Sequence, residues 1–134
     1  MTLNKLMGWS ESFTDEIQTE DFALGYANKA IADINTEAGL VLPFIEDMDE
    51  NYTALPESWF VRLLLPYLNY GIKMNDTSVA EADRYKQEFE ISLIKFKDRA
   101  QSVVAEEFIN EDEKRMFTID TSNAIDIGWF GGRR

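Results

Sequence analysis

Apolar residues recur at helical spacing in the first half of the chain. Between residues 19 and 38 they form one stripe with the period of an α-helix: Phe22, Ala23, Tyr26, Ala27, Ala30, Ile31 and Ile34. Thr19 is a suitable N-cap, and Gly39 is a natural end because glycine tolerates the left-handed backbone that closes many helices. This pattern predicts a helix over 20–38, preceded by a short one over 2–8 that a polar run from Ser10 interrupts.

Two more helices are predicted downstream. Pro56 suits the start of the first of them, because the first turn does not use the N–H that proline lacks. Its predicted buried face comprises Trp59, Phe60, Leu63, Leu64, Tyr67, Leu68 and Ile72. After a turn at 75–78, a seam of apolar residues predicts the longest helix, from about 79 to about 108. The irregular pattern of 40–55 predicts a loop.

These helices predict an all-α fold, a small bundle of three to five helices that occupies residues 1–110. The helical pattern stops after Asn110, where a charged turn is followed by β-branched residues, aromatics and glycines. We therefore expect an extended C-terminal arm over 111–134. A chain of 134 residues can bury a sufficient core without disulfides.

The composition argues against catalysis, because the chain contains no His and no Cys. The commonest general base, the commonest metal ligand and every thiol nucleophile are therefore missing. Neither a glycine-rich phosphate loop nor a nucleophile elbow is recognisable. We expect a protein that is not an enzyme and uses no cofactor. Without a signal peptide or an apolar run of about 20 residues, we also expect a soluble protein.

The chain is strongly acidic, with 25 acidic and 13 basic residues and a formal charge of −12. This charge repels phosphate backbones, so direct DNA binding is disfavoured. It fits either ordinary solubility or a surface that faces a basic partner or lines a passage for DNA.

Four carboxylates lie close together in the predicted loop: Glu46, Asp47, Asp49 and Glu50. Asp47, Asp49 and Asn51 match the first, third and fifth places of a calcium-binding EF-hand loop. The match fails at the sixth place, where Tyr52 replaces glycine, and at the twelfth, where Ser58 replaces glutamate. We interpret this acidic loop as solvated.

The predicted arm carries large apolar residues close to its end. Trp129 and Phe130 stand between glycines, and aromatic residues of this kind often anchor interfaces. Arg133 and Arg134 could pair with acidic groups on a partner. The candidate protein-interaction residues are Ile119, Ile125, Ile127, Trp129, Phe130, Arg133 and Arg134. The alternative is that the arm folds back over its own bundle.

The order of several short elements resembles the small head-to-tail connector (adaptor, or head completion) proteins of long-tailed bacteriophages. The elements that carry this resemblance are Tyr26-Ala27-Asn28, Ile34-Asn35, the loop ending in Leu55-Pro56, Tyr67-Leu68-Asn69-Tyr70 and Tyr85-Lys86-Gln87-Glu88-Phe89-Glu90. Together they cover residues 19–100. The acidic loop and the arm have no counterpart that can be matched position by position.

The resemblance implies a four- or five-helix subunit of a ring, commonly of about twelve copies, under the portal of the DNA-filled head. Such a ring extends the DNA channel and provides a platform for the stopper or tail completion protein. It implies a place in the virion neck, and in the host cytoplasm during assembly. DNA would pass through without specific binding, since carboxylates facing the channel would repel the duplex. Chain ends in this family commonly grip the portal or a neighbouring subunit.

Two other functions remain open. A small acidic protein could imitate DNA and inhibit a basic nucleic-acid-binding protein, although the mixed charges of 79–108 argue against this role. The chain could also be a helical subunit of some other complex.

Overall fold

The computed structural model describes residues 1–14 and 18–110, and the predicted arm lies outside these ranges. Within them, the chain forms five α-helices and one short 3-10 helix, and no strand. The helices are α1 (Leu3–Thr14), α2 (Glu20–Ala38), α3 (Glu57–Asn75), α4 (Val79–Lys97), α5 (Ala100–Val103) and the 3-10 helix Glu106–Phe108. The predicted all-α bundle is confirmed.

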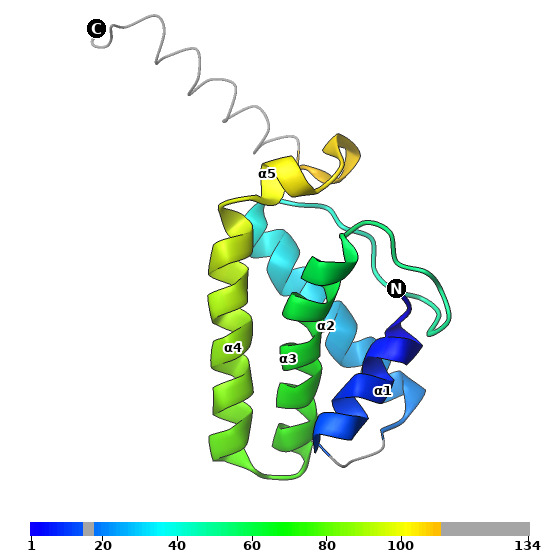
Figure 1. Ribbon diagram of the computed structural model, residues 1–134, viewed down its shortest axis with the longest axis vertical. Coiled ribbons are helices and arrows are strands. Elements are labelled where there is room, and N and C mark those ends of the chain that lie inside the picture. The colour runs from blue at the N-terminus through cyan, green and yellow to red at the C-terminus, as the bar shows by residue number, and fades with distance from the viewer. Residues whose placement is uncertain (15–17, 111–134) are drawn as a thin grey trace, which may run out of the picture.

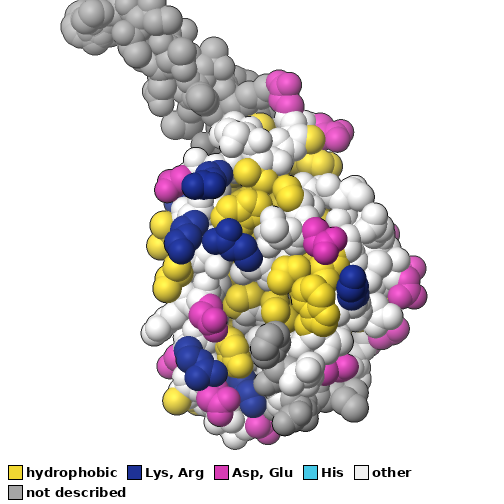
Figure 2. Space-filling model, viewed as in Figure 1, with side chains coloured by type: hydrophobic (Ala, Val, Ile, Leu, Met, Phe, Trp, Pro, Cys, Tyr) yellow, Lys and Arg dark blue, Asp and Glu magenta, His cyan; other side chains and the backbone are white. Residues whose placement is uncertain are grey.

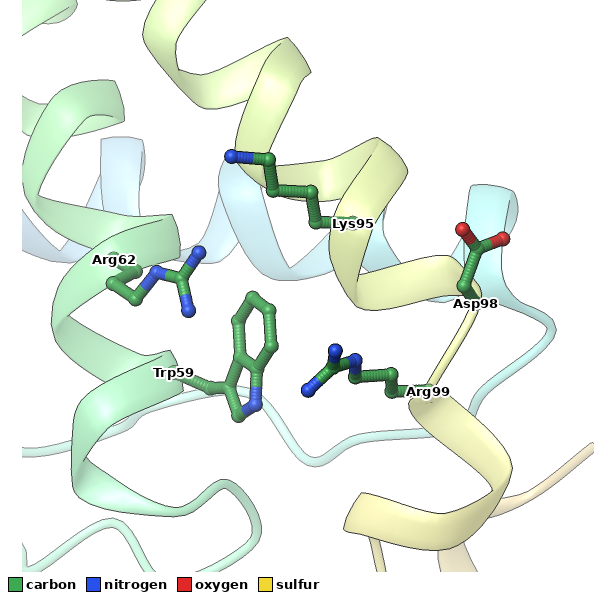
Figure 3. Close-up of a pocket in the computed structure, with 5 residues that line it drawn as sticks. All are labelled: Trp59, Arg62, Lys95, Asp98 and Arg99. Carbon is green, nitrogen blue, oxygen red and sulfur yellow. The ribbon is translucent and has the colours of Figure 1, made fainter.

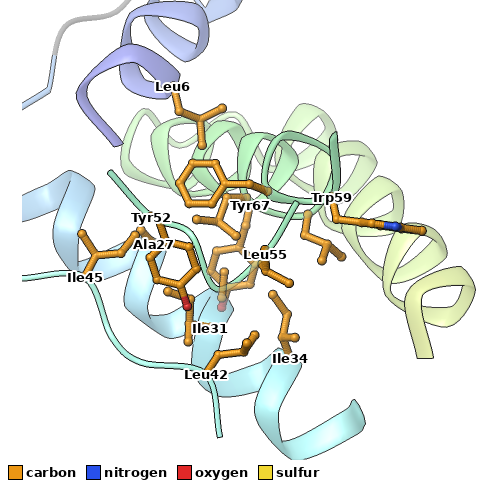
Figure 4. Close-up of a cluster of buried hydrophobic side chains, with 14 of the residues drawn as sticks. Leu6, Ala27, Ile31, Ile34, Leu42, Ile45, Tyr52, Leu55, Trp59 and Tyr67 are labelled. Atoms are coloured by element: carbon orange, nitrogen blue, oxygen red, sulfur yellow. The ribbon is translucent and has the colours of Figure 1, made fainter. Parts of the chain in front are cut away.

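The helix α3 is the centre of the bundle. In Figure 1, α4 runs beside it on one side, α1 packs on its other side, and α2 crosses behind. All seven apolar residues predicted to form its inner face are buried. Figure 4 shows how side chains from α1, α2, α3 and the 40–55 segment meet in one core. The core therefore lies between α3 and the segments around it.

The ends of α2 agree with the sequence prediction. The Phe22 N–H donates to Thr19 Oγ1 at 3.2 Å, which satisfies one of the free donors of the first turn. At the other end, Gly39 adopts the left-handed conformation with φ 67°, and its N–H donates to the Asn35 carbonyl. Local chemistry thus sets both boundaries of this helix.

The helix α1 is longer than the sequence predicted, because it continues through the polar run to Thr14. Its buried polar groups find partners: Ser10 Oγ donates to Asn69 Oδ1 on α3, and Thr14 Oγ1 donates to the Ser10 carbonyl at 2.8 Å. Buried hydroxyls with such partners do not interrupt a helix.

The predicted length of the longest helix is wrong, because α4 ends at Lys97 instead of near residue 108. The backbone turns at Arg99, which has φ −120° and ψ −1°, and α5 and the 3-10 helix follow. The turn brings the Phe108 carbonyl to the Val41 N–H at 2.7 Å and the Asn110 N–H to the Gly39 carbonyl at 2.9 Å. A straight helix would carry these groups away from the bundle, so the turn is stabilised by contacts distant in sequence.

The loop prediction for 40–55 is confirmed, and two asparagines of α2 hold this segment in place. Asn28 Nδ2 donates to the Ile45 carbonyl at 2.9 Å, and the Ile45 N–H donates back to Asn28 Oδ1 at 2.8 Å. Asn35 makes the same pair of bonds with Leu42, at 3.1 and 2.9 Å. Both loop residues are buried. Each asparagine amide therefore makes the pair of hydrogen bonds that a neighbouring strand would otherwise make with the loop backbone.

The spacing of the two pairs fits by simple geometry. Seven residues of an α-helix rise about 10.5 Å. Three residues of extended chain span about 10 Å. Asn28 and Asn35 can therefore both bind the loop only if it runs extended and antiparallel to α2, as it does between Leu42 and Ile45.

We predict that Asn35→Ala lowers the free energy of unfolding by about 1–3 kcal/mol, because two hydrogen bonds of about 0.5–1.5 kcal/mol each are lost. Urea unfolding followed by circular dichroism measures this change. Asn75→Ala is the control: Asn75 is exposed at the end of α3, so this change removes an asparagine amide without touching the loop. Equal effects of the two substitutions would show that the amide does not hold the loop.

Gly71 of α3 permits close contact with α2. A Cβ at this position would lie 2.7 Å from the Tyr26 ring, well inside van der Waals contact. That ring is held by Phe22, Tyr67 and Tyr70, whose ring centroids lie 4.7, 6.2 and 6.4 Å from its own. A Cβ added at Gly25 of α2 would meet no neighbouring atom within 4 Å. The two glycines thus differ in the space that surrounds them.

We predict opposite effects of alanine at these two glycines. Gly25→Ala stabilises by about 0.5–1 kcal/mol, because alanine restricts the unfolded chain and favours the helix. Gly71→Ala destabilises by about 1–3 kcal/mol, the usual cost of overpacking. Thermal unfolding of both variants tests this; a gain in stability from Gly71→Ala would mean that the Tyr26 ring moves freely.

Candidate interaction surfaces

The outer face of α4 carries exposed β-branched residues. Ile91 is 54 % exposed and Ile94 is 63 % exposed. Since successive helical residues turn by about 100°, both lie across the helix from the buried Phe89 and Phe96. In Figure 1, α4 forms an edge of the bundle, and no other described helix covers its outer side. Single apolar residues are common on protein surfaces, but adjacent ones form an apolar patch, and such patches mark interaction sites when they are large.

A shallow cleft lies between the first half of α3 and the end of α4. It has a volume of about 200 Å³ and is lined by Trp59, Arg62, Lys95, Asp98 and Arg99. We call it the Trp59 cleft. The indole forms its floor: Trp59 is only 8 % exposed, and its ring packs on Phe96 with the centroids 5.2 Å apart. The cleft therefore depends on the packing of α3 against α4.

Three cations surround this indole (Figure 3). The Arg62 guanidinium lies over the ring, with Cζ 4.2 Å from its centroid, and Arg99 approaches from the other side. Lys95 lies above them, and the Asp98 carboxylate points away from the ring. None of the three cations forms an ion pair with any residue in the described ranges. A basic cleft of this kind can accept an anionic group.

The acidic loop projects from a different part of the molecule. Glu46, Asp47, Asp49 and Glu50 are all exposed. The loop is fixed to the start of α1 by two hydrogen bonds: the Asn4 N–H donates to the Met48 carbonyl at 2.9 Å, and Asn4 Nδ2 donates to Asp49 Oδ1 at 3.1 Å.

Within the loop, the Asp49 N–H donates to Asp47 Oδ1 at 2.9 Å, and the Met48 side chain is buried. The loop therefore presents its carboxylates in a set arrangement. Within residues 1–14 and 18–110, no group of three or more His, Cys, Asp or Glu side chains is placed to hold a metal ion.

A second hollow, of about 290 Å³, lies between α2 and α4. Its lining is mixed in charge: Asp33, Thr36, Glu37, Lys86, Phe89, Glu90 and Leu93. Beside it, Lys86 Nζ lies 5.4 and 4.8 Å from the centroids of the Tyr67 and Tyr70 rings. Burial and the nearby Asp33 carboxylate raise the pKa of Tyr67 to about 12. Aromatic and charged side chains of α2, α3 and α4 therefore meet at this hollow.

The sequence singled out the acidic loop but not the outer face of α4, the Trp59 cleft or the hollow between α2 and α4. The predicted interaction residues of the arm, from Ile119 to Arg134, lie outside the described residues. Ile91 and Ile94 could have been recognised, because they interrupt the polar side of a helical pattern. The Trp59 cleft left no such signal, since Arg62 and Arg99 are far apart in sequence.

Comparison with known proteins found no match to this chain among family models, curated proteins or solved structures. None of the described helices is both long enough and apolar enough to cross a membrane.

We predict that Tyr67→Phe reduces the alkaline loss of stability. The folded-state pKa of about 12 lies above the ordinary value of 10.0. The contribution of Tyr67 is therefore complete below pH 10 and is lost as the pH rises to about 12, because the unfolded chain releases the proton more readily. Urea unfolding at several pH values should give a shallower decline for the variant. Tyr85→Phe is the control, and it should follow the wild-type decline; equal slopes for all three proteins would contradict the prediction.

Proposed function

We propose that this protein is a structural subunit of the head-to-tail connector of a long-tailed bacteriophage. The observation that carries the proposal is the outward-facing pair Ile91 and Ile94 on α4. Exposed β-branched side chains on successive turns, at the edge of a small bundle, favour burial against another subunit. The resemblance of residues 19–100 to connector proteins then indicates which assembly this subunit would join.

In this proposal the subunits form a ring, of about twelve copies, beneath the portal. The ring extends the DNA channel, binds the portal on one side and offers the other side to a stopper or tail completion protein. The net charge of −12 supports a channel that repels the duplex instead of binding it. The protein would work in the virion neck, after assembly in the host cytoplasm, by forming contacts and without catalysis.

The DNA-mimic function is less well supported. A mimic needs carboxylates arrayed like phosphates along its binding face. The Trp59 cleft instead brings Arg62, Lys95 and Arg99 to the surface beside α4. A patch of cations would repel the basic groove that a mimic must enter, so the connector is the better proposal.

Light scattering behind size exclusion tests the proposal, on the full chain alone and mixed with the portal protein from the same genome. We expect the wild-type chain to join the portal as a ring, since the portal provides a circular template. Ile91→Lys/Ile94→Lys should reduce ring formation at least tenfold, because it places two charges in an apolar contact. A wild-type chain that ignores the portal would contradict the connector function.

Ser12→Lys/Thr53→Lys provides the control for this experiment. It adds the same two charges at exposed positions on α1 and on the 40–55 segment, away from the outer face of α4. It should assemble like the wild type. If both lysine variants fail equally, added charge in general and not the α4 face would be responsible.

A further inference from the structure

We infer that the Trp59 cleft of one copy binds the acidic loop of the next copy, a contact that rests on the proposed ring. Each copy would then contact one neighbour through its cleft and the other neighbour through its acidic loop. The occupant of the cleft is therefore a second copy of this chain, entering with carboxylates of Glu46 and Glu50.

The charges of the two surfaces are complementary. The cleft holds Arg62, Lys95 and Arg99 around one indole, with a single carboxylate, Asp98, turned away from it. The acidic loop presents four exposed carboxylates within five residues. In a chain with a net charge of −12, most possible contacts between copies are repulsive. Contact through the basic cleft is favoured because it turns this repulsion into attraction.

The size of the cleft suits side chains. Pockets for small-molecule ligands commonly measure about 300–1,000 Å³. The Trp59 cleft, at about 200 Å³, is smaller and open to solvent. Two arginines can hold a carboxylate through paired N–H groups, a geometry that lysine alone cannot provide. Arg62 and Arg99 lie on opposite sides of the indole, so the cleft presents a guanidinium on each side of the ring.

The placement of the two surfaces fits a head-to-tail contact. In Figure 1 the acidic loop lies next to the start of α1, and α4, whose end lines the cleft together with the first half of α3, runs on the other side of α3. Figure 2 shows a group of Lys and Arg side chains at the upper left and acidic side chains along the right edge, with further charged side chains of both signs at the lower left. Unlike surfaces on opposite sides of a subunit produce rings or filaments instead of closed pairs.

Both surfaces are ordered before they meet. Asn4 ties the acidic loop to α1 through its backbone and its side chain, and Met48 anchors it in the core. Arg62 is held against the Trp59 ring. Binding therefore orders few new groups, and a smaller entropic cost opposes it.

Charge reversal on either side tests this contact. Arg62→Glu/Arg99→Glu reverses the sign of the cleft, and Glu46→Lys/Glu50→Lys reverses the two side chains that enter it. The second variant brings the loop from four negative charges to a net charge of zero while retaining the hydrogen bonds of Asp47 and Asp49. Each variant alone should associate with itself at least tenfold more weakly than the wild type, because the side chains at positions 46 and 50 then carry the same sign as those at positions 62 and 99. An equimolar mixture should recover association, since positions 46 and 50 of each variant again carry the opposite sign to positions 62 and 99 of the other. Sedimentation measures association, and circular dichroism verifies that each variant is folded.

Recovery in the mixture is the decisive result. Two variants that each associate like the wild type, or that fail to recover when mixed, would overturn the cleft-and-loop contact. If rings on the portal persist in both variants, the contact is wrong and the connector function stands. If the mixture recovers association but no chain joins the portal, the contact stands and the connector function is wrong.

Cysteine cross-linking detects the contact even when it is weak, because the chain has no Cys of its own. Arg99→Cys and Glu50→Cys variants are mixed and treated with a short bismaleimide. We expect a cross-linked pair of unlike chains. With Ser12→Cys in place of Glu50→Cys, the yield of cross-linked pairs should be at least tenfold lower, because Ser12 lies on α1, away from the loop. Equal yields would overturn the contact.

Two other occupants of the cleft would also overturn it. A short DNA duplex that binds the wild type and not Arg62→Glu/Arg99→Glu, by fluorescence anisotropy, would assign the cleft to phosphate groups. A second result would assign the cleft to a segment of its own chain. In that case, replacing Glu111, Asp112 and Glu113 by lysine lowers the stability of the single chain without weakening association. Glu46→Lys/Glu50→Lys then also leaves association intact.

Discussion

The amide pairs of Asn28 and Asn35 are the interaction on which the rest of the bundle depends. Between Leu42 and Ile45, the 40–55 segment pairs with no strand among the described residues, so its buried backbone groups need side-chain partners. The asparagines supply them at Leu42 and Ile45. This attachment lets an irregular segment cover the core between α2 and α3. It also positions Gly39 and Val41, to which the segment after α5 hydrogen-bonds.

The same attachment positions the acidic loop. After Ile45 the chain turns away from α2, and Met48 enters the core beside the start of α1. The carboxylates on either side of Met48 then point to solvent. Burial and the neighbouring Glu50 charge raise the pKa of Tyr52, whose hydroxyl donates to the Pro43 carbonyl at 2.7 Å. Core packing and surface charge are thus set by one segment, so a change in the core would also move the charged surface.

Packing of α4 on α3 has a comparable role on the other side of the molecule. Phe96 supports the Trp59 indole, and the turn at Arg99 brings a second guanidinium to the ring. Because this turn is held by hydrogen bonds to residues 39 and 41, the cleft depends indirectly on the same loop. A small protein can in this way fix the positions of both an acidic and a basic surface.

The sequence alone determined the α2 boundaries, the inner face of α3 and the exposed acidic loop, because caps, helical periodicity and clustered charge are local properties. It did not determine the end of α4: the apolar seam runs on past residue 97, and only bonds to residues 39 and 41, far earlier in the chain, favour the turn. The extension of α1 depended likewise on Asn69. The Trp59 cleft joins residues from two helices, so its charges converge only after the helices pack. Tertiary structure decided these features because each balances local preference against partners that are distant in the chain.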